Sequence, residues 1–256
     1  MFISSVSGGL DDYLRSIYRY GCIPSRFTSG ETIEIDDSNL ISGYIRDTVL
    51  DEDELMPPVA TLFTSVFMHG GIFHLLGNMW FLWLFGDNVE DRFGRLLFPI
   101  FYIACGIIAG LIHIFAEWGS TVPAVGASGA IAGVMGAYIY MFPRGSIATL
   151  WGYWWYWTTI HVPASVYLGI WFVLQLLGGF ASSGSNVAFW AHIGGFLAGL
   201  ILTILFHKLG LITWWPGDRG YNDGAGGLPF RAGGRRVTTM SYNSPPRRRK
   251  RYVWRE

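Results

Sequence analysis

Long apolar stretches alternate with short polar breaks through the middle of this 256-residue chain. A helix that crosses a bilayer needs roughly 20 mostly apolar residues, within a range of about 17 to 25. Five segments meet this requirement: 72–89, 96–116, 126–142, 164–181 and 187–206. They lack the charged face that a surface helix of a soluble protein carries. We therefore expect five membrane spans rather than a large soluble helical core.

The breaks between the apolar segments hold polar and aromatic residues. The first break, residues 86–94, contains three carboxylates and one arginine. The longest break, residues 143–163, contains six Trp or Tyr side chains between positions 151 and 157. Tryptophan and tyrosine gather at membrane–water interfaces. This long break is therefore expected to be a loop that contributes to an aromatic belt.

Composition supports a membrane protein and excludes several other classes. Charged residues make up 14% of the chain, whereas an ordinary soluble domain has about 25%. Hydrophobic residues make up 51%, which excludes a chain that is mainly disordered. Two cysteines are too few for a disulfide scaffold. The net charge of zero argues against a nucleic-acid partner bound by overall positive charge.

The zero net charge is a sum of opposite regions. Residues 1–62 carry a net charge of −7, residues 63–206 carry −1, and residues 207–256 carry +8. Because Lys and Arg are enriched on the cytoplasmic side of membranes, the basic end is expected in the cytoplasm. Counting back through five spans then places the acidic beginning of the chain outside.

Three parts of the chain are predicted from these patterns. Residues 1–55 form an acidic extracytoplasmic segment, and residues 56–207 form the transmembrane domain. Residues 208–256 form a disordered basic cytoplasmic tail, which could touch anionic lipid. We expect a multi-pass protein of a prokaryotic plasma membrane whose polar cavity opens to the extracytoplasmic side.

Four polar side chains are predicted to lie at similar depth in three of the spans. His74 and Asn78 are four residues apart and so share one helix face. Ser128 lies near the outer end of its span, and His192 lies just inside the last span. Polar residues in a membrane are costly and indicate function. Together these four residues predict a hydrated cavity that opens outward.

These residue types match the parts of a serine hydrolase. Ser128 is the candidate nucleophile and His192 its general base. A helix start at Ser128 would offer free backbone N–H groups to a developing oxyanion, and His74 and Asn78 could donate to it as well. No carboxylate is predicted at the same depth to orient His192, so we expect a dyad rather than a triad. No metal and no cofactor are required.

Small residues predict where the helices meet. Gly129, Gly133 and Ala137 lie four residues apart in the third span. The last span repeats this spacing, with Ala191, Gly195 and Gly199. Such faces let helix backbones approach closely in a membrane. This approach would bring a serine hydroxyl and an imidazole into hydrogen-bonding range.

The same motifs resemble the rhomboid family of intramembrane serine proteases, over roughly residues 56–207. The resemblance rests on segments in a fixed order: 69–78 (HGGIFHLLGN), 90–94 (EDRFG), 126–129 (GASG), 162–175 (with VPA, WF and Gln175) and 191–195 (AHIGG). It implies an all-α polytopic membrane helical bundle. It also implies an endopeptidase that cleaves single-span membrane proteins in or near their transmembrane helix.

The resemblance assigns roles to particular residues. It implies a catalytic dyad of Ser128 and His192 that forms an acyl-enzyme. It implies oxyanion stabilisation or substrate binding at His74, Asn78 and Gly126, together with the backbone N–H of Ser128. The implied partners are transmembrane protein substrates and the lipid bilayer, with no nucleic acid and no metal.

Some features depart from the family pattern. Minimal members have six helices, whereas five are visible here, so the first helix of the core is expected to be absent through truncation or a misplaced start. No Trp-Arg pair precedes His69, and Ala132 stands where some members have a tyrosine against the histidine. Two other functions remain open: a catalytically impaired rhomboid-like protein that binds membrane clients, and a small-solute pathway lined by histidines.

Overall fold

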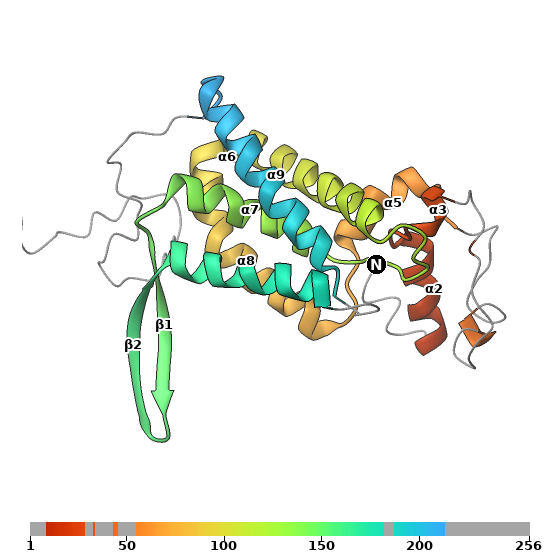
Figure 1. Cartoon of the computed structure of the whole chain (residues 1–256), viewed down its shortest axis with the longest axis horizontal. Helices are drawn as coiled ribbons and strands as arrows, with labels where there is room; N and C mark the ends of the chain where they lie inside the picture. Colours follow the sequence, from red (N-terminus) through yellow and green to blue (C-terminus); the bar gives the residue numbers. More distant parts are fainter. Residues whose placement is uncertain (1–8, 29–32, 34–42, 46–54, 182–186, 213–256) are drawn as a thin grey trace, which may run out of the picture. The chain divides into compact units, whose positions relative to one another are not determined.

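The computed structural model describes residues 9–28, 33, 43–45, 55–181 and 187–212 of the chain. Four apolar helices dominate it (Figure 1): α6 (Ile72–Ala116), α7 (Ser128–Met141), α8 (Ala164–Ala181) and α9 (Phe189–Lys208). Three of them, α6, α8 and α9, are long and apolar enough to cross a bilayer. The prediction of a polytopic helical membrane bundle is therefore confirmed. The tail expected over residues 208–256 lies outside the described residues from position 213 onward.

Helix α6 contains the first two predicted spans as two helical parts that run in different directions on either side of a kink (Figure 1). The helical dihedral angles break at Gly94, where φ is 77° and ψ is 164°. This positive φ is a conformation that glycine adopts readily and other residues avoid. The two predicted spans are thus separated at the end of the predicted break, residues 86–94, by a sharp kink at Gly94 instead of a longer loop.

Helix α7 is shorter than the span predicted for it. Its 14 residues extend about 21 Å, and the hydrocarbon core of a bilayer is about 30 Å thick. The residues from 117 to 127 have no helix assigned and lead directly to Ser128. Ser128 is therefore reached through a non-helical segment and lies at the very start of the short helix.

The core lies where α6, α7 and α9 pack together. Phe85, Phe101, Met135 and other large side chains are fully buried there. The predicted contact between small-residue faces is confirmed. A methyl group at Gly195 would overlap the carbonyl oxygen of Gly129, and one at Gly199 would overlap that of Gly133. These glycines allow α7 and α9 to touch through their backbones.

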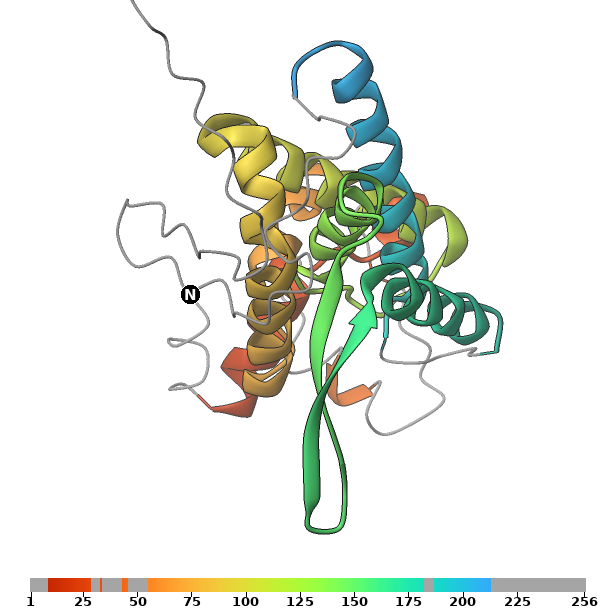
Figure 2. The same cartoon turned by 90° about the vertical axis from the view of Figure 1, so that its left-hand side faces the viewer.

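The segment predicted as a loop between α7 and α8 is a β-hairpin. Strand β1 (Ser146–Tyr153) pairs antiparallel with strand β2 (Tyr156–Pro163), from Ser146 opposite Pro163 to Tyr153 opposite Tyr156. The hairpin projects away from the bundle and runs crosswise to α7 and α8 in both views (Figures 1 and 2). The run of aromatics lies on both faces of the strands, so the alternation typical of a strand is absent from the sequence and the hairpin was not predicted.

The acidic N-terminal segment contacts the bundle through its described residues, which include α2 (Leu10–Tyr20) and the short α3 (Ser25–Thr28). The predicted transmembrane domain then begins with α5 (Pro58–Thr64) and the 3₁₀ helix η3 (Ser65–Phe67). Cys22 and Ala124 exchange two backbone hydrogen bonds, and the Ser25 amide donates to the Ser120 carbonyl. The segment thereby holds the loop that leads to Ser128.

Candidate active site

Ser128 is the first residue of α7. The first backbone hydrogen bond of this helix runs from the Ile131 amide to the Ala127 carbonyl, at 2.9 Å. The amides of residues 128–130 precede this bond and have no partner within the helix. Free N–H groups and the helix dipole favour negative charge at such a position. The serine hydroxyl therefore sits beside donors suited to an oxyanion.

His192 lies in the first turn of α9 and meets Ser128 across the glycine contact. Its Nε2 atom is 2.8 Å from the Ser128 hydroxyl oxygen. The two residues are 64 positions apart, and the backbone contact between Gly129 and Gly195 brings them together. The structure thus places the predicted nucleophile and the predicted base within hydrogen-bonding distance.

The other ring nitrogen of His192 has a partner that the sequence analysis did not identify. The Nδ1 atom lies 2.8 Å from Oε1 of Gln175, a buried residue of α8. The sequence predicted no carboxylate that could orient His192, and Gln175 is an uncharged amide. The signal that could have found it was its position as a strongly polar residue within an otherwise apolar span.

An aromatic ring covers one face of His192. The Trp171 ring centroid lies 5.9 Å from that of the imidazole, with an interplanar angle of 37°. Trp171 belongs to α8 and lies one turn before Gln175. Ala132, where some relatives of this sequence pattern have a tyrosine, is fully buried in α7. The aromatic contact with His192 is thus made from α8, rather than from α7.

His74 is held in one tautomer by the backbone before it. The Gly70 amide donates to His74 Nδ1 at 3.3 Å. A neutral His74 therefore carries its proton on Nε2, which faces the loop before Ser128. A methyl group built on Gly126 would lie 2.9 Å from this Nε2 atom. His74 Nε2 is consequently placed as a hydrogen-bond donor close to Gly126 and Ser128.

Gly126 contributes space rather than a hydrogen-bond donor. Its amide already donates to the Ser65 carbonyl at 2.9 Å. Its φ of 129° lies in the region that favours glycine, and any side chain there would collide with the His74 ring. A glycine at this position lets the loop and His74 approach each other closely.

Asn78 lies one turn after His74 on the same face of α6. It is buried, and its Nδ2 atom has no hydrogen-bond partner in the described part of the chain. A buried donor without a partner is costly. Such a donor is suited to a carbonyl oxygen or an oxyanion that arrives with a substrate.

His69 precedes α6 and packs against His74, with ring centroids 5.5 Å apart. Its burial, together with the proximity of His74, lowers the pKa of His69. The imidazole is therefore neutral at physiological pH and adds no charge to the site.

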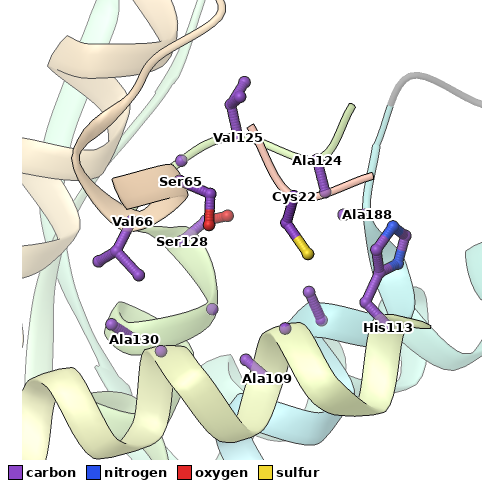
Figure 3. Close-up of a pocket in the computed structure, with 15 residues that line it drawn as sticks. Cys22, Ser65, Val66, Ala109, His113, Ala124, Val125, Ser128, Ala130 and Ala188 are labelled. Carbon is purple, nitrogen blue, oxygen red and sulfur yellow. The ribbon is translucent and has the colours of Figure 1, made fainter. Parts of the chain in front are cut away.

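A small cavity adjoins Ser128 (Figure 3). Its volume is about 40 Å³, and a buried water requires about 10–15 Å³ on this measure. Side chains of Cys22, Ser65, His113 and Ser128 surround it. His113 is buried in α6, and its Nδ1 atom lacks a hydrogen-bond partner among the described residues. The cavity therefore offers room and polar partners for a few water molecules next to Ser128.

Comparison with known proteins identifies a family. The family model of the Rhomboid domain matches residues 57–209. The chain is 32% identical over 144 residues to RHOMBOID-like protein 5 of Arabidopsis thaliana, which covers 55% of this chain and 42% of that protein. It is 35% identical over 139 residues to Rhomboid protease GluP of Bacillus subtilis, covering 54% of this chain and 24% of that protein.

A mitochondrial protein is also similar. The human Presenilin-associated rhomboid-like protein, mitochondrial, is 32% identical over 88 residues, which cover 34% of this chain and 23% of that protein. The chain thus spans less than half the length of each of these relatives. Within the described residues, no group of three or more His, Cys, Asp or Glu side chains is arranged to hold a metal ion.

Proposed function

Because this chain belongs to the rhomboid family, we propose that it is an intramembrane serine endopeptidase with Ser128 as nucleophile and His192 as general base. The single observation that carries the proposal is the 2.8 Å contact between His192 Nε2 and the Ser128 hydroxyl. A nucleophile and base within hydrogen-bonding distance form the core of this type of catalysis. The family relationship to GluP, a bacterial rhomboid protease, supports the same reaction.

Acylation follows from the geometry. Ser128 Oγ attacks the carbonyl carbon of a substrate peptide bond while its proton passes to His192 Nε2. The negative charge that develops on the carbonyl oxygen is stabilised by N–H donors, for which the candidates are His74 Nε2, Asn78 Nδ2 and the Ser128 amide. His192 then protonates the leaving amine, which leaves an acyl-enzyme on Ser128.

Deacylation requires a water molecule beside the ester. The cavity next to Ser128 supplies room for water, with His113 Nδ1 and the Ser65 side chain on its wall. His192 takes a proton from this water as it attacks the acyl carbon. The product acid leaves, and Ser128 regains its proton from His192.

The membrane setting determines the class of substrate. The chain is an integral membrane protein, so a peptide bond reaching Ser128 comes most directly from another membrane-spanning segment. The carbonyls of a transmembrane helix are already hydrogen-bonded within the helix. The substrate must therefore unwind locally, which favours single-span proteins with helix-breaking and small residues near the cut.

Orientation in the membrane follows from the charges. The basic residues after position 207 favour a cytoplasmic location for that end. With α9 then running inward, its start at His192 faces the extracytoplasmic side. We place the enzyme in a prokaryotic plasma membrane with its active site open to the outside.

The alternative is a membrane protein that binds clients without cutting them. The two functions can be separated with the full chain in liposomes that also contain a single-span substrate. Ser128→Ala and His192→Ala should each reduce cleavage at least about 10³-fold, while Ser165→Ala, an exposed serine on α8, should cleave normally. Substrate that is captured but left intact by the unmodified protein would instead establish the client-binding function.

A further inference from the structure

The hairpin of β1 and β2 is the most unusual surface of the molecule. Its 18 residues, 146–163, contain no Asp, Glu, Lys or Arg. Its tip nevertheless projects large side chains: Tyr153 is 71% exposed, Trp154 is 74% exposed and Trp155 is 86% exposed. Five more large apolar or aromatic side chains on its strands are exposed: Leu150, Trp151, Tyr156, Trp157 and Ile160. An apolar surface of this kind marks a binding site rather than a solvated loop.

Water alone is a poor environment for this hairpin. An isolated two-stranded hairpin is at best marginally stable in water. In the described part of the chain, the main contacts of β1 are with β2, and β2 also touches the start of α8. Nothing in these contacts covers the aromatic tip. A surrounding phase other than water must therefore accommodate it.

The root of the hairpin fixes its level in the membrane. The Ala164 amide donates to the Gly145 carbonyl at 2.8 Å, which closes the hairpin at the ends of α7 and α8. Ser128 lies at the opposite end of α7, about 21 Å away. The root thus lies near the membrane boundary opposite the active site.

The hairpin runs crosswise to α8 in both views (Figures 1 and 2), whereas in Figure 2 its direction is closer to that of α9 and the first part of α6. Helix α8 is long and apolar enough to cross a bilayer. Each strand has eight residues, which extend about 27 Å. The hairpin thus diverges from the spanning helix that follows it, and its length is enough to reach into the interfacial layer around its root.

The chemistry of the hairpin matches the interfacial layer. Trp and Tyr combine an apolar ring with a polar N–H or O–H and are enriched where hydrocarbon meets headgroups. The pairing places Trp151, Tyr153 and Tyr156 on one face, while Leu150 and Trp157 lie on the other. Each face therefore carries Trp or Tyr side chains, which combine an apolar ring with a polar group. A layer that surrounds the hairpin suits it better than a partner docked on one face.

Two details at the ends support a lipid contact. Arg144 is exposed immediately before the root, where a cation can meet lipid phosphates. At the tip, Trp154 has a φ of 55°, and glycine is the residue that two-residue turns prefer in this conformation. A bulky indole in that position indicates that the side chain has a function outside the fold.

We propose that the β1–β2 hairpin is a membrane-interface anchor that lies in the headgroup and glycerol layer of the leaflet opposite the active site. The anchor holds the N-terminal end of α8 in that leaflet. This inference is independent of proteolysis, because it rests on exposure, composition and position. It applies equally to a rhomboid that only binds clients.

The test uses the full chain in nanodiscs of phosphatidylcholine and phosphatidylglycerol with one copy per disc. Nitroxide labels are attached at Tyr153→Cys or Trp155→Cys, and their accessibility to aqueous nickel chelate and to oxygen is measured. Asp12→Cys, exposed on α2, is the water control, and Leu177→Cys, exposed on α8, is the hydrocarbon control. The native cysteines, Cys22 and Cys105, are buried and need no replacement.

We expect nickel accessibility at both hairpin sites to be at least fivefold lower than at Asp12→Cys, and oxygen accessibility to lie between the two controls. Nickel accessibility equal to that of Asp12→Cys would overturn the anchor. So would protection that appears only in discs with two copies, because the occupant would then be a second chain. Two label sites keep the test decisive if one variant folds poorly.

A second inference comes from the buried amide beside His192, and it rests on the proposed function. Gln175 Oε1 can only accept a hydrogen bond, so His192 Nδ1 must carry the proton in their 2.8 Å contact. Nε2 is then unprotonated and accepts from the Ser128 hydroxyl. The opposite tautomer would place an N–H against Ser128 and could not take its proton.

We infer that Gln175 is a positioning residue that fixes the tautomer of His192. The orienting partner in many serine hydrolases is a carboxylate. Here the amide performs the same orientation without placing a charge inside the membrane, where charges are costly. The contact also ties α8, which is largely exposed, to the reaction centre.

The test combines kinetics with a spectroscopic signature. Gln175→Met keeps the length of the side chain and removes the acceptor, while Gln175→Glu restores an acceptor. We expect kcat to fall about 10- to 100-fold in Gln175→Met with KM nearly unchanged, and to recover in Gln175→Glu. Equal kcat in Gln175→Met and the unmodified protein would refute the inference.

Nitrogen-15 spectra of histidine-labelled protein in bilayers report the tautomer directly. His192 should show the Nδ1–H form in the unmodified chain and a mixture dominated by Nε2–H in Gln175→Met, assigned by its absence in His192→Phe. An unchanged tautomer in Gln175→Met would also refute the inference. Because this readout needs no cleavage, it distinguishes a failure of the Gln175 role from a failure of the proposed protease activity.

Discussion

The contact of α7 with α9 and the hairpin that follows α7 are neighbours in sequence and opposites in structure. Neither α7 nor the hairpin (residues 146–163) contains Asp, Glu, Lys or Arg. The helix contact uses glycine and alanine and buries them against a facing backbone. The hairpin uses Trp and Tyr and exposes them. Four residues, 142–145, separate the two regions.

This difference shows that apolar character alone does not decide burial in a membrane protein. Lipid is as apolar as a leucine side chain, so helices associate through close packing and polar contacts. Small residues provide the close packing in the helix contact, which then brings Ser128 to His192. Large amphipathic rings suit the interface instead. The same overall hydrophobicity therefore accompanies a backbone contact that pairs Ser128 with His192 in one region and an exposed aromatic hairpin in the other.

The largest effect is expected from filling the helix contact. Gly195→Val places a side chain on the Gly129 carbonyl, so α7 and α9 must separate. Overpacking costs about 1–3 kcal/mol even where side chains can yield, and a backbone oxygen cannot. We expect loss of the folded bundle in thermal melts, together with loss of the Ser128–His192 pair.

Gly169→Val on α8 is the matched control for that change. No atom lies within 4 Å of the position that a Cβ atom would take at Gly169. We expect its melting temperature to stay within a few degrees of the unmodified protein. Equal melting temperatures for Gly195→Val and Gly169→Val would mean that the glycine contact does not hold the bundle together.

The second prediction compares the reactivity of a buried thiol with that of a thiol at the exposed tip of the hairpin. Burial raises the pKa of the Cys22 thiol to about 12, so only about 10⁻⁴ of it is thiolate at pH 8. A cysteine at the exposed tip, in Trp155→Cys, has no such protection in detergent. Maleimide labelling followed by mass spectrometry should show Cys22 reacting at least about 10³-fold more slowly. Comparable rates would show that the N-terminal segment does not pack on the bundle.

The third prediction concerns Asn78 of helix α6, a candidate donor to the oxyanion. Asn78→Ala removes a buried donor that has no partner among the described residues. Loss of one oxyanion donor costs about 10²–10³ in kcat. Initial rates of substrate cleavage in liposomes should fall by that factor, while the melting temperature is unchanged or slightly higher because an unsatisfied buried group is gone. A cleavage rate within twofold of the unmodified protein would exclude Asn78 from the oxyanion site.

The smallest effect is expected at the hairpin tip. Trp154→Gly relieves a φ of 55°, which costs a non-glycine residue about 1–2 kcal/mol. The turn should become slightly more stable in detergent, with no change in the Ser128–His192 contact and no loss of activity there. Hydrogen exchange of the paired strand amides measures the change. Faster exchange in Trp154→Gly would mean that the indole itself supports the turn.

The sequence predicted the spans and the polar residues well where periodicity and depth govern the fold. The range 164–181 coincides with α8, and the spacing of Gly129, Gly133, Gly195 and Gly199 predicted the helix contact. The kink at Gly94 was not predicted, because a polar break does not distinguish a loop from a glycine hinge. The hairpin was missed because its aromatics lie on both faces, which removes the alternation of a half-buried strand.

The candidate site was predicted only in part, for a different reason. Ser128, His192, His74 and Asn78 stand out in sequence as polar residues within apolar spans. The partnership of Gln175 with His192 depends on how α8 packs against α9, which no spacing along the chain specifies. The hydrogen bond from the Gly126 amide to the Ser65 carbonyl is likewise a tertiary contact. Neither contact could be predicted without the three-dimensional fold.

The central claim is that the glycine contact makes Ser128 a nucleophile by placing it against His192. The most direct measurement is covalent labelling of the full chain in bilayers by a fluorophosphonate, with the modified residue located by mass spectrometry. We predict a single adduct on Ser128 that is lost in His192→Ala and retained in Ser165→Ala. Labelling of Ser128 that persists in His192→Ala, or no adduct on Ser128 in the unmodified protein, would contradict the account.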